Sequence, residues 1–168
     1  YIRARQSCRI VAGRQQATRR RRLLALSDEA YASPHESARV VANSGNNIAV
    51  YLGITSLGQG HETIMAQICA DALGVPIEQI TVFHGNSDFL PSGGGTYASR
   101  GTVMGGNAVF LAGQELRREI LKIAASYLGT AADELNMQEG QIYRKGAERE
   151  NPLLSLGEVV ELARPGSQ

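Results

Sequence analysis

The segment Gly58-Gln59-Gly60-His61-Glu62-Thr63 places two glycines directly before a run with helical periodicity. At such a position free backbone N–H groups meet the positive end of a helix dipole, and glycine lets a ligand approach the backbone. Thr63 stands where G-x-G-x-x-G requires a third glycine, and the chain has no G-x-x-x-x-G-K-[ST] motif. The segment therefore predicts a loop that holds an anionic cofactor, with a purely structural strand-to-helix turn as the alternative.

A second glycine-rich segment, residues 92–100, repeats this arrangement: three consecutive glycines precede hydroxyl side chains, a cation and a predicted helix start. The guanidinium group of Arg100 suits a phosphate or carboxylate, and the hydroxyl groups can donate hydrogen bonds. The hydroxyl donors are Thr96, Ser99 and Thr102. Two such loops can hold one ligand between them. For Arg100 the alternative is a salt bridge on the surface.

Catalytic side chains are harder to find. His61 and Glu62 begin an H-E-x-x-H zinc motif, but Met65 occupies the position of its second histidine. His84 and Asp88 could act as a base and its orienting carboxylate, although a histidine beside a strand is more often structural. No serine lies in a G-x-S-x-G motif. We therefore predict no catalytic residue and no metal ligand in this chain.

Hydrophobic patterning predicts the elements that position these loops. Runs rich in β-branched residues beside turn residues predict strands, and apolar residues at helical spacing predict helices. The predicted elements are a hairpin of residues 38–42 and 48–54, a helix from His61 to Leu73, a strand from Ile80 to His84, a loop at 85–95, a long helix from Ser99 to Leu128, a short helical piece at 131–135, a strand at 141–144 and a closing helix from Leu156 to Ala163.

Four glycines interrupt the long predicted helix, at Gly101, Gly105, Gly106 and Gly113. Each weakens a helix by up to about 1 kcal/mol relative to alanine, so the pattern indicates a backbone that another part of the molecule approaches closely. For Gly113 we expect a neighbouring sheet in preference to a ligand.

Composition fits one globular domain. The chain has 168 residues, of which 43% are hydrophobic and 5% aromatic, as expected for an α/β or α+β protein. Cys8 and Cys69 lie far apart, and Cys69 falls on the apolar face of a predicted helix, which favours a core residue over a disulfide or metal ligand. The sequence has no long apolar run and no signal-like N-terminus, so we expect a cytoplasmic protein without membrane contact.

Basic residues are concentrated at the N-terminus. Eight of the 17 basic residues precede Leu23, where no acidic residue occurs: Arg3, Arg5, Arg9, Arg14, Arg19, Arg20, Arg21 and Arg22. Such an arm could bind nucleic acid or an acidic surface, although no aromatic residue is interleaved with the arginines and no recognition motif follows them. A non-enzymatic binding module with this arm is the alternative function. A solvated terminus or a shifted reading frame would also explain the arm.

The blocks GQGHETIMAQICADALGVPIEQITVFHGNSD (58–88) and GGGTYASRGTVMGGNAV (93–109) together resemble the molybdenum-cofactor-binding region of the large subunits of xanthine dehydrogenases, aldehyde oxidases and carbon monoxide dehydrogenases. The resemblance extends from about Glu36 to Ala163. It implies an α+β fold, a two-layer molybdenum-cofactor-binding domain with a mixed sheet and two main helices.

The same resemblance implies which residues hold the cofactor, a molybdopterin with molybdenum, in its cytosine dinucleotide form in most bacterial members. The expected contacts are Gly58, Gln59, Gly60 and His61 in the first loop and Thr96, Tyr97, Ala98, Ser99 and Arg100 in the second. The second loop is expected to lie at the pterin or phosphate end.

The family reaction implied is hydroxylation of an aldehyde or N-heterocycle carbon with water as the oxygen source, with electrons leaving through iron–sulfur clusters and often FAD. The expected partners are the rest of the molybdenum subunit, iron–sulfur and flavin subunits and a small-molecule substrate. The family's active-site glutamate has no counterpart here, and residues 1–35 do not follow the family pattern. We therefore expect a fragment whose cofactor-binding domain spans 36–168 and which does not turn over substrate alone.

Overall fold

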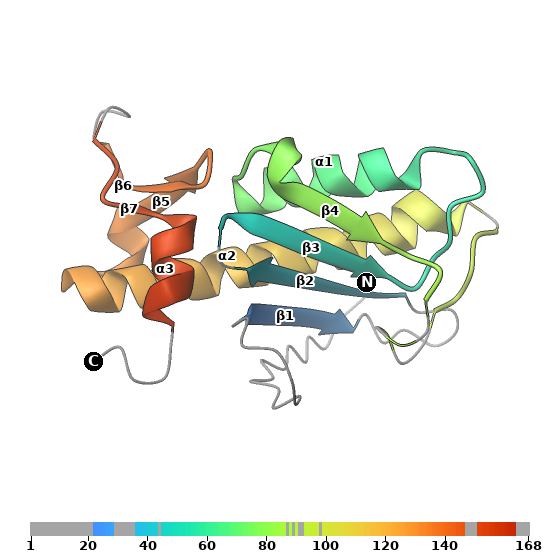
Figure 1. Cartoon of the computed structure of the whole chain (residues 1–168), viewed down its shortest axis with the longest axis horizontal. Coiled ribbons are helices and arrows are strands. Elements are labelled where there is room, and N and C mark those ends of the chain that lie inside the picture. Colours follow the sequence, from blue (N-terminus) through green and yellow to red (C-terminus); the bar gives the residue numbers. More distant parts are fainter. Residues whose placement is uncertain are drawn as a thin grey trace, which may run out of the picture.

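A computed structural model of the chain describes residues 22–28, 36–43, 45–86, 88, 90, 93–97, 99–146 and 151–163. These residues form a four-stranded mixed sheet and a three-stranded sheet, with three α-helices packed against them (Figure 1). The predicted α+β class, with a mixed sheet and two main helices, is confirmed.

The mixed sheet has the strand order β1-β2-β3-β4. Its strands are β1 (Arg22–Asp28), β2 (Ser37–Asn43), β3 (Asn47–Leu52) and β4 (Ile80–Phe83). Strands β2 and β3 form the predicted antiparallel hairpin, and β4 lies at the predicted position. Strand β1 pairs antiparallel with β2 from Arg22 to Asp28, although it precedes the domain boundary expected at residue 36.

Strand β3, helix α1 (His61–Leu73) and strand β4 form a β-α-β unit, because β3 and β4 are parallel. The carboxyl ends of parallel strands lie at the same edge of a sheet, where α/β proteins commonly bind ligands. The segments that leave β3 and β4 are therefore neighbours in space, although α1 separates them in the sequence. Helix α1 has the predicted bounds and ends at Gly74 in the left-handed conformation (φ 84°).

The long predicted helix has two parts. Residues Gly101–Gly105 form a π-helix, and α2 (Gly106–Leu128) continues from it as a regular α-helix. Short π-helical segments within α-helices are frequent at functional sites. Helices α1 and α2 lie on the same face of the mixed sheet (Figure 1). There they bury a core with β2 and β3 that includes Val40, Ile48, Val50, Met65, Leu73, Val109, Leu116 and Ile120.

Glycines on α2 and the π-helix face α1. A Cβ atom at Gly113 would lie 3.0 Å from Ala72 Cβ, and one at Gly106 would lie 2.9 Å from Ile68 Cδ1. The expectation that a sheet lies beside Gly113 is therefore wrong, because the close neighbours are Ala72 and the backbone of α1. The absence of side chains lets the two helix backbones approach closely. Both helices begin at the same edge, where the β3 and β4 strands end (Figure 1).

The second sheet has the order β5-β6-β7. Its strands are β5 (Leu135–Gln138), β6 (Gln141–Arg144) and β7 (Leu154–Ser155), followed by α3 (Leu156–Leu162), and short 3₁₀ turns occupy Ile77–Gln79 and Ala132–Glu134. The helical piece predicted at 131–135 is thus a 3₁₀ turn that leads into a strand. The strand at 141–144 and the closing helix are confirmed, and Ser155 and Glu158 form a capping box at the start of α3.

Helix α2 passes both sheets (Figure 1), and its Arg117 joins the end of α1 to the second sheet. One Nη atom of Arg117 donates to the carbonyl of Leu73 at the end of α1 (2.8 Å), and the other donates to the carbonyl of Met137 in β5 (2.7 Å). Desolvation lowers the pKa of Arg117. The carbonyl groups in the last turn of a helix lack N–H donors within the helix, and Arg117 supplies a donor to one of them, that of Leu73.

Cys69 is a free, fully buried thiol, and burial raises its pKa to about 12. Its predicted place in the core is confirmed. Across the described residues, none of the helices is long and apolar enough to span a bilayer.

Candidate cofactor-binding site

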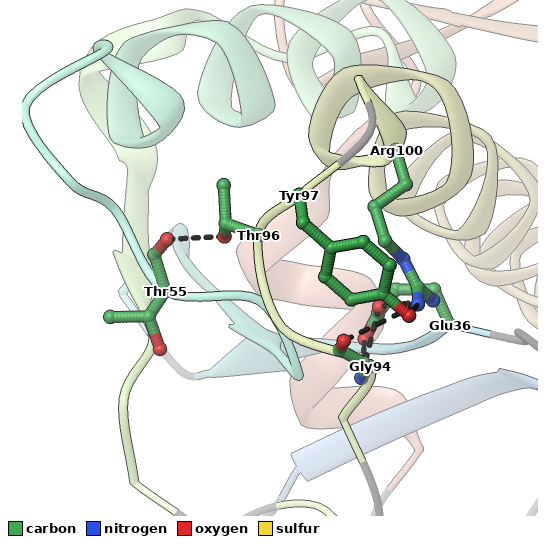
Figure 2. A network of polar contacts seen from close by, with 6 residues as sticks. All are labelled: Glu36, Thr55, Gly94, Thr96, Tyr97 and Arg100. Atoms are coloured by element: carbon green, nitrogen blue, oxygen red, sulfur yellow. Dashed lines mark hydrogen bonds and ion pairs between the residues drawn. The ribbon is translucent and has the colours of Figure 1, made fainter.

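The two predicted glycine loops meet at the edge of the sheet where β3 and β4 end. We call residues 53–60 the first loop and residues 93–100 the second loop. The hydroxyl group of Thr96 donates to the carbonyl oxygen of Thr55 (2.5 Å), as Figure 2 shows. A Cβ atom on Gly93 would lie 2.0 Å from the carbonyl oxygen of Gly53. The loops are therefore in direct contact, and the second loop depends on glycine at that contact.

The first loop exposes its backbone. Gly58 (φ 98°) and Gly60 (φ 74°) both have positive φ angles, and a Cβ on either would point into open space. Gly60 directly precedes α1 and has no side chain to accept hydrogen bonds from the first turn. The exposed Gln59 folds back, and its Oε1 accepts a hydrogen bond from the N–H of Leu57 (2.5 Å). The start of α1 is thus available to an external acceptor.

The second loop also presents groups to solvent. Tyr97 is 57% exposed, and the exposed Ser99 has φ 58°, a conformation that non-glycine residues rarely adopt. Such backbone geometry is concentrated at functional sites. Thr96 is half-buried by its contact with Thr55. Ala98, which was also predicted to contact the cofactor, lies outside the described residues.

Arg100 is buried, at 4% exposure, and it pairs with the equally buried Glu36 (1% exposed; Nη2 to Oε2 3.0 Å). Its other terminal nitrogen, Nη1, donates to Tyr97 Oη (2.9 Å) and to the carbonyl of Gly94 (3.3 Å), as Figure 2 shows. Arg100 does form a salt bridge, but the expectation that it lies on the surface is wrong, because both partners are buried. Both terminal nitrogens already have acceptors within the chain.

His61 is also buried, at 4% exposure. Its imidazole ring packs on the π-helix, so that a Cβ atom on Gly101 would lie 2.5 Å from Cε1 and Nε2. Nδ1 of His61 is buried and finds no hydrogen-bond partner among the residues that the structure describes. His61 thus joins the start of α1 to the start of the π-helix.

Glu62 accepts hydrogen bonds from two side chains beside the first loop. Nε2 of His84 donates to its Oε1 (2.7 Å) and the hydroxyl of Ser56 donates to its Oε2 (3.0 Å). The carboxylate that orients His84 is therefore Glu62, and the pairing considered between His84 and Asp88 is wrong. Asp88 instead donates its backbone N–H to Asn86 Oδ1. Hydrogen bonds from its own backbone N–H, from His84 and from Ser56 lower the pKa of Glu62.

Glu62→Gln is expected to reduce the acid sensitivity of the fold. Because the folded-state pKa is lowered, the Glu62 carboxylate contributes stability that is fully present above its ordinary pKa of 4.5. This contribution is lost as pH falls through the lower folded value. Thermal unfolding midpoints measured from about pH 7 to about pH 3 should fall less steeply in the variant. Glu78→Gln, which removes an exposed carboxylate outside this network, is the control, and equal slopes for Glu62→Gln and the unmodified chain would contradict the assignment.

Sequence reasoning missed the residues that support the loops. Glu36 lies 58 residues from Gly94 and 64 from Arg100, and Thr55 lies 41 residues from Thr96. No local pattern marks such partners. The proximity of Glu62 to Ser56 and to the end of β4 also depends on how α1 packs beside the parallel strands.

Comparisons with known proteins place the chain in a family. The family model described as "Molybdopterin cofactor-binding domain" matches residues 15–167. The 6-hydroxypseudooxynicotine dehydrogenase complex subunit gamma of Paenarthrobacter nicotinovorans is 30% identical over 83% of this chain and 17% of its own length. The carbon monoxide dehydrogenase large chain of Afipia carboxidovorans is 35% identical over 68% of this chain and 14% of its own length.

Among solved structures, quinoline 2-oxidoreductase from Pseudomonas putida 86 superposes with a TM-score of 0.70 and 27% identity, covering 88% of this chain and 21% of that one. The chain thus spans about a fifth or less of these relatives. The family match covers both loops, the mixed sheet and both main helices. The chain therefore belongs to the molybdopterin cofactor-binding domain family, and its relatives are the large subunits of molybdenum hydroxylases.

Proposed function

We propose that this chain supplies two loops that bind the molybdopterin cofactor of a molybdenum hydroxylase large subunit. The proposal rests on one observation: the two glycine loops meet beside the start of α1, where the Thr96 hydroxyl donates a hydrogen bond to the Thr55 carbonyl. Backbone N–H groups at a helix start and nearby hydroxyls suit the phosphate oxygens of such a cofactor. The donor set therefore fits an anionic, hydrogen-bonding ligand.

The proposed direct contacts are Gly58, Gln59 and Gly60 in the first loop and Thr96, Tyr97, Ala98 and Ser99 in the second. Of those that the structure describes, all are exposed except the half-buried Thr96. His61 and Arg100 receive a different role from the one that the sequence predicts. Both are buried, and the terminal nitrogens of Arg100 have acceptors inside the chain, so we assign these two side chains to the support of the loops.

The cofactor, when bound, supplies the oxidation of an aldehyde or N-heterocycle carbon with water as the oxygen source. The contribution of this chain is to bind and orient the cofactor, and we propose the cytosine dinucleotide form. The rest of the large subunit, with iron–sulfur and flavin subunits, would complete the enzyme. The names of the relatives, a "large chain" and a "subunit gamma" of a complex, support an assembly of several subunits. We expect the isolated chain to be inactive.

Gln59→Ala is expected to lower cofactor retention by about tenfold, since a hydrogen bond to a charged group contributes about 1.5 kcal/mol or more. The chain is purified with its native partners from a host that makes the cofactor, and bound pterin is measured by fluorescence after oxidation. Gln67→Ala is the matched control, because Gln67 is an exposed glutamine farther along α1. Equal pterin content in all three proteins would refute the placement of the first loop.

A further inference from the structure

Glu36 is the buried acidic residue among the described residues whose carboxylate contacts the second loop at two points. Its Oε2 accepts from Arg100 Nη2 (3.0 Å), and both oxygens lie within hydrogen-bonding distance of the Gly94 N–H (3.2 and 3.4 Å). Glu36 stands immediately before β2, so the sheet itself carries the carboxylate. Figure 2 shows the loop passing around the guanidinium group between these contacts.

The second loop is shaped around the guanidinium group of Arg100. A Cβ atom at Gly94 would lie 2.2–2.3 Å from three guanidinium atoms, so the loop backbone rests directly on this group. The ring of Tyr97 lies over the guanidinium carbon, 5.1 Å from ring centroid to Cζ, and the Tyr97 hydroxyl accepts from Nη1. The backbone N–H of Arg100 also donates to the Tyr97 carbonyl (3.1 Å).

A contribution to stability does not by itself account for a buried pair of this kind. Removing two charges from water is costly, and apolar residues of similar volume are often equally stabilising or more so. In some proteins a buried polar pair instead specifies a defined geometry, because its hydrogen-bond directions restrict the groups that it contacts. In this chain the restricted groups are Gly94 and Tyr97, which flank Thr96.

We infer that Glu36 is a positioning residue, which acts through Arg100 and the Gly94 N–H to hold the second loop in its cofactor-binding shape. This inference rests on the proposed function, since it concerns the same site. We place Glu36 itself in contact with neither the cofactor nor the substrate. Its effect reaches the ligand through Gly94 and Tyr97, the loop residues that Glu36 and Arg100 contact.

The test compares stability with cofactor retention in the chain purified with its native partners from a cofactor-producing host. The variants are Glu36→Asp, Glu36→Gln and the double variant Glu36→Met with Arg100→Met. For each, the urea midpoint of unfolding and the pterin bound per chain are measured. Glu119→Gln is the control, because it removes a half-buried carboxylate (22% exposed) that pairs with the exposed Lys122 on α2 and has no contact with the second loop among the described residues. It should match the unmodified chain in both measurements.

The double variant should recover the urea midpoint of the unmodified chain while its bound pterin stays at least fivefold lower. Recovery of both quantities together would overturn the inference, because the pair would then act on stability alone. Glu36→Asp keeps the charge but is too short to reach both partners, so it too should lose at least fivefold in pterin. Wild-type retention in Glu36→Asp would overturn the inference even if the double variant failed to fold. Absence of pterin from the unmodified chain would instead refute the proposed function.

Discussion

Replacement of Arg100 by alanine is expected to lower the free energy of unfolding by about 3–5 kcal/mol. The substitution leaves the carboxylate of Glu36 without its counter-ion at 1% exposure. It also removes the donors to the Gly94 carbonyl and to Tyr97 Oη. The free energy is obtained from urea unfolding followed by circular dichroism, extrapolated to water.

Arg118→Ala is the matched control for this substitution. Arg118 lies on α2 and pairs with Glu115, but its side chain is 58% exposed, so its loss should change stability by no more than about 0.5 kcal/mol. A loss below about 1 kcal/mol for Arg100→Ala would show that Glu36 finds another partner once the guanidinium is removed. The internal ion pair would then not be the main support of the second loop.

Gly113→Leu is expected to lower the free energy of unfolding by about 2–3 kcal/mol. At this position a single Cβ atom would already lie 3.0 Å from Ala72 Cβ and 3.8 Å from the Cys69 carbonyl oxygen. The further atoms of leucine would force α1 away from α2. Because α1 carries His61 and the end of the first loop, its displacement should also lower the amount of pterin bound.

The neighbouring residue provides the control, since Gln114 lies on the exposed side of α2. Gln114→Leu introduces the same side chain one position later, where it meets solvent, and should leave stability within about 0.5 kcal/mol of the unmodified chain. Both variants are compared by urea unfolding and by pterin content. Equal behaviour of the two leucine variants would mean that close contact between the helices is not needed to hold the site.

The predictions for Arg100 and Gly113 both concern the elements that support the two loops. The first loop leads directly into α1, whose His61 packs against the start of the π-helix, and the second loop is held by Glu36 and Arg100. The loops meet through Thr96 and Thr55 on the side of the sheet where the parallel strands end. Rigid elements thus carry the exposed groups that are proposed to bind the cofactor, which is how protein sites hold ligands in a defined geometry.

Local patterns in the sequence predicted the elements well because the forces that form them act over a few residues. Turn residues between β-branched runs indicated the β2–β3 hairpin, and helical spacing before Gly74 indicated α1 with its observed bounds. The glycine loops were recognised for the same reason. The π-helix was predicted as α-helix, because hydrophobic spacing over five residues does not distinguish the two.

The sequence by itself thus determined the two loops, the main helices and the family to which the chain belongs. Only the tertiary structure decided the partners of the charged side chains: Arg100 with Glu36 and His84 with Glu62. It also decided that Gly113 meets a helix and that β1 extends the sheet. The physical reason is distance along the chain. Which charge is buried beside which, and which backbones touch, depends on long-range packing of the whole core, and short-range patterns do not record it.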